Sequence, residues 1–414
     1  MVAAVRNPYA GAVLPAGMVD TDRFGAERVN EVYRRGMLEG ETEDFPVSYE
    51  DLREAAHEAM DENGVAYVHG GAGSDETFER DKDFSAWRIV PRMLRGVESR
   101  DLSTSLMGTE IDYPVVLTPL GVQTLLHEQG EIGTAEGAAE LNVPLCLSSL
   151  SSTPMEDVAE ALGDTPKFFQ FYWSSSDAIA KSFLDRAENA GYDGIVVTVD
   201  APILGWRERL IERGYYPFLE GEGVANYFSD PEFRAQLDEP PEENPEAAVE
   251  HFLDVFGDSS LTWEDLQFVH DNTDLPVFIK GVLHPEDARL AVRHGADGIG
   301  VSTHGGRQVD GSITAVEALP EIVDEVGDVV DITLDSGVRR AADAFKSVAL
   351  GADAVMLGRP YAYALAAGGR EGVSTYLENF VAEFDLTMGL AGHDAVREVG
   401  RDAVRHESTL APGN

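Results

Sequence analysis

The chain contains 414 residues, with 75 Asp and Glu against 31 Lys and Arg, and a formal net charge of −44 at pH 7. Hydrophobic residues make up 43% of it, which is enough for a core and excludes a wholly disordered chain. The strong negative charge argues against binding to nucleic acid or to an anionic membrane surface. Because the acidic residues are spread along the whole chain, we interpret them as a halophilic adaptation to a salty cytoplasm, where ions screen them. A docking surface for a basic partner is the alternative, but it would concentrate the acid in one block.

Cys146 is the single cysteine, so the chain can form neither an intrachain disulfide nor a thiolate metal cluster. It lies in an apolar run, Val143–Leu147, where we expect a small core residue. The N-terminal residues lack a basic segment followed by an apolar core, and no apolar run approaches the ~20 residues of a membrane span. We therefore predict a cytoplasmic protein without a signal peptide, a membrane segment or a metal site.

The first 110 residues are expected to form an arm and helices that pack on the main domain. Residues 1–45 are rich in Gly and acid and predict an irregular arm. Ser48–Asp61 predicts a helix, with Ser48 as its N-cap and Asp51 completing a capping box. Val65–Val68 is expected to be extended before a glycine loop, and Thr77–Trp87 predicts a second helix.

From Tyr113 onward, short apolar runs alternate with helical patterns. Eight such runs predict buried strands, at 113–118, 144–148, 168–172, 194–199, 276–280, 298–301, 331–334 and 354–357. Helical patterns lie between them, at 130–141, 155–162, 176–190, 285–294, 315–326 and 342–350. This alternation predicts an α/β fold, a closed (β/α)₈ TIM barrel over residues 111–400 followed by a tail at 401–414, in one structural domain. A doubly wound sheet is the alternative, but no G-x-G-x-x-G or G-x-x-x-x-G-K-[ST] motif occurs.

One connection interrupts this alternation. A long excursion between Val199 and Pro276 contains the aromatic stretch Tyr215–Phe228 and a Pro- and Glu-rich stretch, Asp238–Glu246. Because it follows the fourth strand, it would overhang the mouth of the barrel. We predict a lid at about residues 203–262, with a solvated and mobile acidic middle.

Catalytic residues of such barrels follow the C-terminal ends of the strands. After the sixth strand, His304 and Arg307 lie three residues apart on a glycine-rich turn. Histidine can take a proton near neutral pH, and arginine offers a planar fork to a carboxylate, so the pair suits oxidation of an anionic substrate. A helix-capping loop with a surface arginine is the alternative. Asp200, after the fourth strand, could orient His304, although it could also cap the following loop.

The last strands carry a candidate phosphate site. Asp335-Ser-Gly-Val-Arg339 and Gly358-Arg359 follow the seventh and eighth strands, where barrels often bind phosphate. Salt bridges at the rim are the alternative for the two arginines. Lys280 ends the fifth strand in a chain with only five lysines. It could stabilise a reduced flavin or form a Schiff base.

With these residues identified, the chain resembles the FMN-dependent 2-hydroxy-acid oxidising family, which includes glycolate oxidase, lactate oxidase and lactate 2-monooxygenase. The resemblance covers about residues 48–400. Its most specific part is Ser302-Thr-His-Gly-Gly-Arg-Gln308, similar to the family's S-N-H-G-[AG]-R-Q, with Thr303 in place of the usual Asn. Supporting motifs are Phe168–Tyr172, Thr198–Pro202 with Arg207, Phe278–Gly281, Leu334–Arg340, Leu357–Pro360 and Tyr67-Val-His-Gly-Gly-Ala-Gly73.

The resemblance implies FMN as cofactor and a role for each matching residue. His304 would take the substrate's proton, hydrogen-bonded to Asp200, and Tyr172 would contact the substrate hydroxyl. The carboxylate would be bound by Arg307, Arg207 and Tyr67. Lys280 would lie beside the flavin, whose remaining contacts would come from Pro119, Leu120, Gly121, Ser148, Gln170, Thr198 and Ser302 at the ring and from Asp335, Gly337, Arg339, Gly358 and Arg359 at the ribityl chain and phosphate.

Within the family, the chain is most similar to lactate 2-monooxygenase. The segments Leu204–Arg207, Pro217–Leu219 and Asn226-Tyr227 and the long excursion carry this resemblance. Leu150 replaces the tryptophan of glycolate oxidases, which favours a larger substrate. The resemblance implies oxidation of a lactate-like L-2-hydroxy acid with O₂, of oxidase or monooxygenase type, by a homotetramer or homo-octamer. Alternatives are a dehydrogenase that passes electrons to a quinone or protein, a flavin-dependent isomerase, and a non-catalytic binder.

Overall fold

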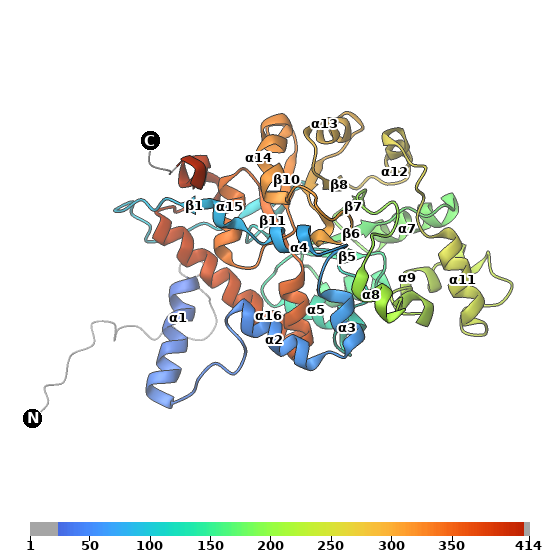
Figure 1. Ribbon diagram of the computed structural model, residues 1–414, viewed down its shortest axis with the longest axis horizontal. Helices are drawn as coiled ribbons and strands as arrows, with labels where there is room; N and C mark the ends of the chain where they lie inside the picture. The colour runs from blue at the N-terminus through green and yellow to red at the C-terminus, as the bar shows by residue number, and fades with distance from the viewer. Residues whose placement is uncertain (1–23, 410–414) are drawn as a thin grey trace, which may run out of the picture.

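The computed structural model describes residues 24–409, and these are built around a closed barrel of eight parallel strands (Figure 1). The barrel order is β10-β11-β4-β5-β6-β7-β8-β9. Each strand falls on a predicted apolar run, so the predicted (β/α)₈ architecture is confirmed. The strands are β4 (Val115–Leu117), β5 (Leu145–Ser148), β6 (Lys167–Phe171), β7 (Gly194–Thr198), β8 (Val277–Val282), β9 (Gly298–Val301), β10 (Asp331–Leu334) and β11 (Ala354–Leu357).

The interior of the barrel is apolar, and a hairpin closes it at the N-terminal ends of the strands. Cys146, Phe168, Val196 and Phe278 point into one buried cluster with residues of a hairpin, β2 (Thr104–Leu106) and β3 (Thr109–Ile111). Phe278 fills the space beside Gly298 so completely that a Cβ there would lie 2.2 Å from its ring. This plug places the free end of the barrel, and hence the site, at the C-terminal ends of the strands.

Helices surround the barrel as predicted, with one addition. The six predicted helices are confirmed as α5 (Gly130–Ala139), α6 (Met155–Leu162), α7 (Asp177–Asn189), α13 (Pro285–Arg293), α14 (Ala315–Val326) and α15 (Ala341–Ala349). The sequence analysis missed α16 (Arg359–Ala391), whose backbone is kinked at Gly368 and Gly369. Its residues are apolar on most sides because it packs against α1, α2, α5 and α15.

The N-terminal part is more helical than predicted. Residues 24–39, expected in an irregular arm, form α1 (Phe24–Arg34) and a π-helical turn, η2 (Arg35–Glu39); residues 1–23 lie outside the described residues. In Figure 1, α1 and α2 (Tyr49–Ala59) lie alongside α16. The α2 prediction is confirmed, including Ser48, whose hydroxyl accepts the N–H of Asp51.

Two further predictions in this region were wrong. The expected extended segment at 65–68 belongs to helix α3 (Glu62–Val68), because Asp61 accepts the N–H of Gly64 and restarts a helix there. The helix expected over 77–87 is broken into α4 (Glu76–Asp81), a 3₁₀ turn η3 (Phe84–Ala86) and strand β1 (Trp87–Ile89). The expected C-terminal tail supplies β12 (Val404–His406), which pairs antiparallel with β1; residues 410–414 lie outside the described residues.

The segment between β7 and β8 is largely helical rather than structureless. It contains α8 (Glu208–Arg213), η5 (Pro217–Glu220), α9 (Ala225–Phe228), α10 (Pro231–Arg234), α11 (Pro245–Val255), η6 (Trp263–Asp265) and α12 (Leu266–Asp271). Its aromatic residues extend the main core, since Tyr227 packs against Phe233 and Phe252 of the segment and against Phe183 of α7. Whether this β7–β8 segment moves as a lid stays a prediction.

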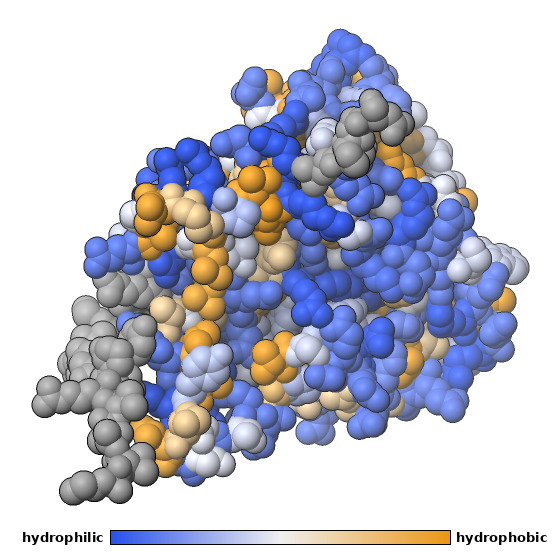
Figure 2. Space-filling model, turned by 60° about the vertical axis from the view of Figure 1, so that its left-hand side comes forward, coloured by the Kyte–Doolittle hydropathy of each residue, from blue (hydrophilic) through white to orange (hydrophobic). Residues whose placement is uncertain are grey.

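Most of the surface in Figure 2 is hydrophilic, with a stripe of exposed hydrophobic residues on the same face. Among residues 24–409, no helix is both long enough and apolar enough to span a membrane.

Asn226 is the buried anchor of the β7–β8 segment. Its amide oxygen accepts the N–H of Met155 at 2.8 Å, and its amide nitrogen donates to the carbonyl of Ser149 at 3.2 Å. Asn226→Ala should lower the free energy of unfolding by roughly 2–4 kcal/mol, because both buried backbone groups lose their partner. Urea unfolding measures this, with the exposed Asn189→Ala as control. An equal midpoint for the two variants would show that Asn226 does not anchor the segment.

Candidate active site

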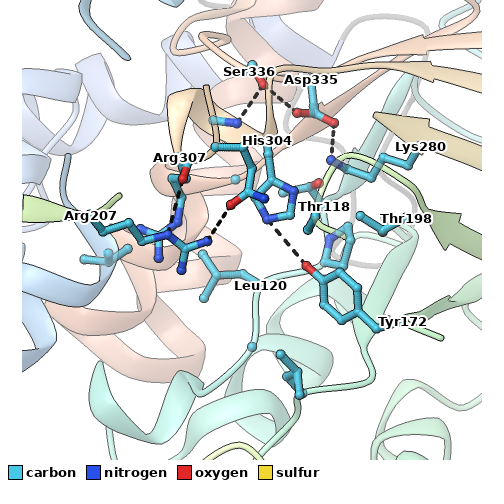
Figure 3. A pocket seen from close by; sticks show the side chains of 18 of the residues that line it. Thr118, Leu120, Tyr172, Thr198, Arg207, Lys280, His304, Arg307, Asp335 and Ser336 are labelled. Atoms are coloured by element: carbon cyan, nitrogen blue, oxygen red, sulfur yellow. Dashed lines mark hydrogen bonds and ion pairs between the residues drawn. The ribbon is translucent and has the colours of Figure 1, made fainter. Parts of the chain in front are cut away.

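A pocket lies at the C-terminal end of the barrel, where loops from seven of the eight strands meet. Figure 3 shows its side chains converging from β7, β8, β9 and β10 around His304. The β7–β8 segment contributes one wall, and the end of α3, through Tyr67 and Val68, contributes another. The predicted residues that line this pocket are Tyr67, Pro119, Leu120, Gly121, Tyr172, Thr198, Arg207, Lys280, His304, Arg307, Asp335, Gly337, Arg339, Gly358 and Arg359.

His304 is held between a carboxylate and a phenol. Its Nδ1 lies 2.8 Å from Oδ1 of Asp200, and its Nε2 lies 3.4 Å from the hydroxyl of Tyr172. Burial lowers the pKa of His304 below its usual value, and Lys280 and Arg207 lower it further although Asp200 opposes them. Burial works to raise the pKa of Asp200, but His304 and Lys280 outweigh it and hold that pKa low. The pair therefore combines a neutral imidazole with an ionised carboxylate, which fixes Nε2 as the proton acceptor.

The turn that carries His304 has an unusual backbone. His304, Gly305 and Gly306 all have positive φ, at 57°, 65° and 72°. A non-glycine residue in this region costs energy and persists only where the surroundings hold it. Ser336 supplies part of that hold, because its hydroxyl accepts the N–H groups of Thr303 at 3.1 Å and Gly305 at 2.9 Å. The glycines at 305 and 306 are therefore required by the backbone, as well as by close packing.

Lys280 forms a buried ion pair on the floor of the pocket. Its Nζ lies 2.8 Å from Oδ2 of Asp335 and donates to the hydroxyl of Ser302 at 2.9 Å. Burial works to lower the pKa of Lys280, but Asp335 and Asp200 outweigh it and keep the amine charged. A fixed cation therefore lies at the floor of the pocket. Such a cation would stabilise a cofactor ring that gains negative charge.

Two cations face the pocket together. The Arg307 guanidinium lies 5.3 Å from the centroid of the Tyr67 ring and donates to the Tyr67 carbonyl at 2.5 Å. Arg207 donates to the carbonyl of Arg307 at 3.3 Å and to the side chain of Gln308 at 3.1 Å (Figure 3). Burial and the neighbouring Arg207 push the pKa of Arg307 well below its usual value. Within residues 24–409 neither guanidinium pairs with a carboxylate, so an anionic ligand would relieve this repulsion.

The chain matches a known family over most of its length. The model of the FMN-dependent dehydrogenase family matches residues 56–406. The chain belongs to this family. It is 41% identical over 353 residues to an L-lactate oxidase of Lysinibacillus sphaericus, covering 85% of this chain and 91% of that protein. It is also 36% identical over 365 residues to the human 2-hydroxyacid oxidase 1, with 86% and 95% covered.

Solved structures agree with this assignment. A crystal structure of mandelate oxidase matches with a TM-score of 0.77 at 34% identity, covering 87% of this chain and 98% of that one. A fungal relative from Penicillium citrinum, 40% identical over 361 residues with 86% and 90% covered, is an FMN-dependent alpha-hydroxy acid dehydrogenase. The predicted family, the enzyme class, the FMN cofactor and the general function, FMN-dependent oxidation of a 2-hydroxy acid, are thereby confirmed.

The pocket of this flavoenzyme fits FMN by the chemistry of its polar atoms. Nε2 of Gln170, Oγ1 of Thr198 and Nε of Arg339 are buried without a hydrogen-bond partner in the structure. Such orphaned groups require a ligand, and an isoalloxazine offers oxygens and nitrogens along one edge. The N terminus of α16 also opens at the pocket through Gly358 and Arg359 and favours a phosphate.

Some predicted residues lie behind the pocket instead of lining it. Ser148 donates to the side chain of Gln170 at 3.1 Å, and Ser302 donates to Asp335 at 2.7 Å, so both support residues closer to the ligand. Arg359, in contrast, lines the pocket; it donates to the carbonyls of Val68 and Gly70 at 2.9 and 2.5 Å, and no carboxylate in the described chain pairs with it. Its side chain therefore supports the glycine loop from the side of the pocket.

Sequence analysis missed several lining residues. Ser336 follows Asp335 in a motif that was noticed, and its φ of 73° gave no sequence signal because serine rarely adopts it. Tyr216, Phe218 and Phe256 come from the β7–β8 segment, whose internal fold had no periodic pattern to place them. The family match could have indicated Ser336, but only coordinates locate the three aromatic residues.

The arginine pair predicts stabilisation by a small carboxylate. Propionate at 100 times its dissociation constant should stabilise the flavin-loaded protein by about 2.7 kcal/mol. Arg307→Met should lose this effect because the buried cation is gone. Thermal unfolding with and without propionate measures it, and the exposed Arg213→Met serves as control. Equal stabilisation of the Arg307→Met variant would place the carboxylate elsewhere.

Proposed function

We propose that the enzyme oxidises a small L-2-hydroxy acid, lactate or a near homologue, and delivers the electrons through FMN to O₂. One observation supports this most strongly. A neutral imidazole oriented by a carboxylate, His304 on Asp200, shares one turn with Arg307 at a pocket that fits FMN. The combination supplies a base and a carboxylate anchor for the same substrate molecule.

Some residues of the pocket bind the substrate, and others transfer its proton. Arg307 and Arg207 bind the substrate carboxylate with Tyr67, and Tyr172 contacts the hydroxyl. Burial raises the pKa of Tyr172 above its usual value, so this phenol stays protonated and can donate. Nε2 of His304 takes a proton from the substrate, and Asp200 stabilises the imidazolium that forms. FMN, when bound, accepts the two electrons, and Lys280 offsets the negative charge that develops there.

The walls of the pocket favour a short apolar side chain on the substrate. Leu150, Leu204, Phe218 and Phe256 line it without a polar group for a substrate tail. Gly121 allows Leu150 to approach, since a Cβ at 121 would lie 2.5 Å from the Leu150 carbonyl. These contacts suit lactate better than an acid with a charged or hydroxylated tail, in keeping with the L-lactate oxidase relative.

The fate of the first product depends on the β7–β8 segment. Ile203, Leu204 and Tyr216 from this segment line the pocket, so it can retain a bound product. Retention allows peroxide to decarboxylate the oxo acid, giving acetate, CO₂ and water instead of pyruvate and H₂O₂. We propose this monooxygenase type as the outcome, with the oxidase type as the alternative. A homotetramer or homo-octamer and a cytoplasmic location stay predictions.

Flavin reduction tests the proposed activity. Anaerobic L-lactate should bleach the visible absorbance of the flavin in the purified protein. His304→Ala should slow this bleaching by ~10²–10⁴-fold because the base is lost. His251→Ala, at a half-buried histidine outside the pocket, serves as control, and flavin content is measured for both variants. Rapid bleaching by His304→Ala would exclude His304 as the base. No bleaching of the wild type by any 2-hydroxy acid would refute the proposed function.

The aerobic products and the electron acceptor distinguish the types of enzyme. Acetate and CO₂ indicate a monooxygenase, and pyruvate with H₂O₂ indicates an oxidase. Reoxidation that is slow in air but fast with a quinone analogue would instead indicate a dehydrogenase, the name carried by the fungal relative. The assay is run in molar salt as well as in dilute buffer, because a chain of net charge −44 repels itself when unscreened.

The pH dependence follows from the pKa of His304. Because that pKa is lowered, kcat/KM should rise as His304 loses its proton, with a midpoint below 6.5, and stay level above it. Asp200→Asn removes the charge that raises the pKa of His304, so the midpoint should move to lower pH while the plateau falls. A midpoint that moves upward in Asp200→Asn would contradict this assignment.

A further inference from the structure

Helix α4 lies directly beneath the turn that carries His304. A Cβ on Gly306 would lie 2.6 Å from the backbone of Phe78, so the two backbones are in contact there. The first turn of α4 is fixed to the same region, since Asp310 accepts the N–H groups of Ser74 at 2.7 Å and Thr77 at 3.1 Å. The last residue of α4 is Asp81, whose side chain is 2% exposed.

Asp81 and Thr303 form a buried hydrogen-bonded pair at the start of the turn. The hydroxyl of Thr303, 5% exposed, donates to Oδ2 of Asp81. The hydroxyl oxygen of Thr303 in turn accepts the N–H of Gly306 at 3.1 Å. Because a hydroxyl has one proton, donation to Asp81 orients its lone pairs toward Gly306. The pair thus links α4 to the far end of the His304 turn.

We propose that Asp81 and Thr303 are positioning residues, which hold the His304–Arg307 turn in the conformation that presents the base and the carboxylate anchor together. The inference rests on the proposed function of that turn and goes beyond the residues assigned above. Neither side chain lines the pocket, so both act through the backbone they hold.

The backbone conformation of the His304 turn explains why hydrogen bonds such as those of Asp81 and Thr303 are needed to hold it. Positive φ is no strain for Gly305 and Gly306, but His304, at 57°, is a non-glycine residue that keeps this conformation only where its surroundings hold it. Ser336 binds the N–H groups of Thr303 and Gly305 on one side of the turn. The Thr303 hydroxyl binds Gly306 on the other side, and without it that buried N–H keeps only the backbone carbonyl of Thr303, at 3.1 Å. A shift of about 1 Å at a reacting group can cost ~10²-fold in rate.

The surroundings of Asp81 make its charge sensitive to pH. Burial raises the pKa of Asp81 to about 6, and Asp335 raises it further, whereas Thr303, the N–H of Ala315 and Arg359 lower it. Since the folded state holds this proton more tightly than the unfolded state, the wild type loses stability as pH rises through about 6. Asp81→Asn removes that titration, so its stability relative to the wild type should increase as pH rises from about 4 to about 6 and then level off.

Three variants test the positioning role. Thr303→Val replaces the hydroxyl with a methyl group and should lower the limiting rate of anaerobic flavin reduction by ~10- to 100-fold, with FMN still bound. Thr303→Ser keeps the hydroxyl and should restore the rate to within about 3-fold, since only the methyl group is lost. Thr165→Val, at a buried threonine before β6 at the other end of the barrel, serves as the matched control.

Hydrogen exchange provides a readout that needs no turnover. In Thr303→Val, peptides that contain Gly306 should exchange faster than in the wild type, and propionate should bind more weakly because Arg307 shares the turn. Asp81→Ala should reproduce these changes, and the Asp81→Ala/Thr303→Val double variant should add little to either, because the two residues act as one unit. Asp81→Asn keeps an acceptor oxygen and should remain close to the wild type.

The outcomes separate the two proposals. Wild-type flavin reduction and wild-type exchange in Thr303→Val would overturn the positioning role while leaving the proposed activity intact. Additive losses in the double variant would also overturn it. If the wild type reduces no flavin with any 2-hydroxy acid, the proposed function fails, and the exchange and propionate measurements still decide whether the pair holds the turn.

Discussion

The carboxylate of Asp335 connects the charge on the pocket floor to the backbone of the turn above it. Its Oδ2 pairs with Lys280 at 2.8 Å, and its Oδ1 accepts the hydroxyls of Ser302 and Ser336, each at 2.7 Å. These two hydroxyls accept backbone N–H groups in turn, Ser302 from His304 and Ser336 from Thr303 and Gly305. One buried acid thus fixes the cation proposed to face the flavin and the backbone that carries the proposed base, His304. Removing it would leave Lys280 as an unpaired buried charge, the costly case for an ion pair.

Several of the few cationic residues of this acidic chain lie together in the pocket. Only 31 of 414 residues are Lys or Arg, yet Arg207, Lys280, Arg307, Arg339 and Arg359 all line one pocket. Most of them are held by backbone carbonyls instead of carboxylates, so their positive charge is not neutralised locally. Such a pocket attracts a small anion and a phosphate into a molecule whose surface repels both. The positive charge that an anionic ligand could meet is therefore concentrated in the barrel mouth.

The barrel was predictable because two-sided burial leaves a direct sequence signal. All eight strands fall on continuous apolar runs, and the polar residues that end them converge, as in the Asp200–His304 hydrogen bond of 2.8 Å. The remaining elements depend on tertiary contacts. The helix at Glu62–Val68 reads as a strand in its Val-Ala-Tyr-Val sequence, and only the cap from Asp61 and packing decide otherwise. Likewise, the pairing of β12 with β1 joins residues about 300 positions apart, which no local pattern can indicate.

The site is completed by segments that lie far apart in the sequence, and the glycine loop after α3 joins them. The N–H of Ala72 donates to the carbonyl of Gly306, and the N–H of Gly73 donates to that of Trp206, both at 2.8 Å. At Gly71 a Cβ would lie 2.4 Å from the Gly306 carbonyl, so the loop needs glycine to approach the His304 turn this closely. Arg209 of α8 then pairs with Asp75 at 2.6 Å, which ties the β7–β8 segment to the same loop. Any motion of that segment must therefore break its contacts with this loop or move the loop, and through it the turn that bears the proposed base, His304. This linkage explains why residues of the N-terminal helices, outside the barrel itself, belong to the catalytic end of the molecule.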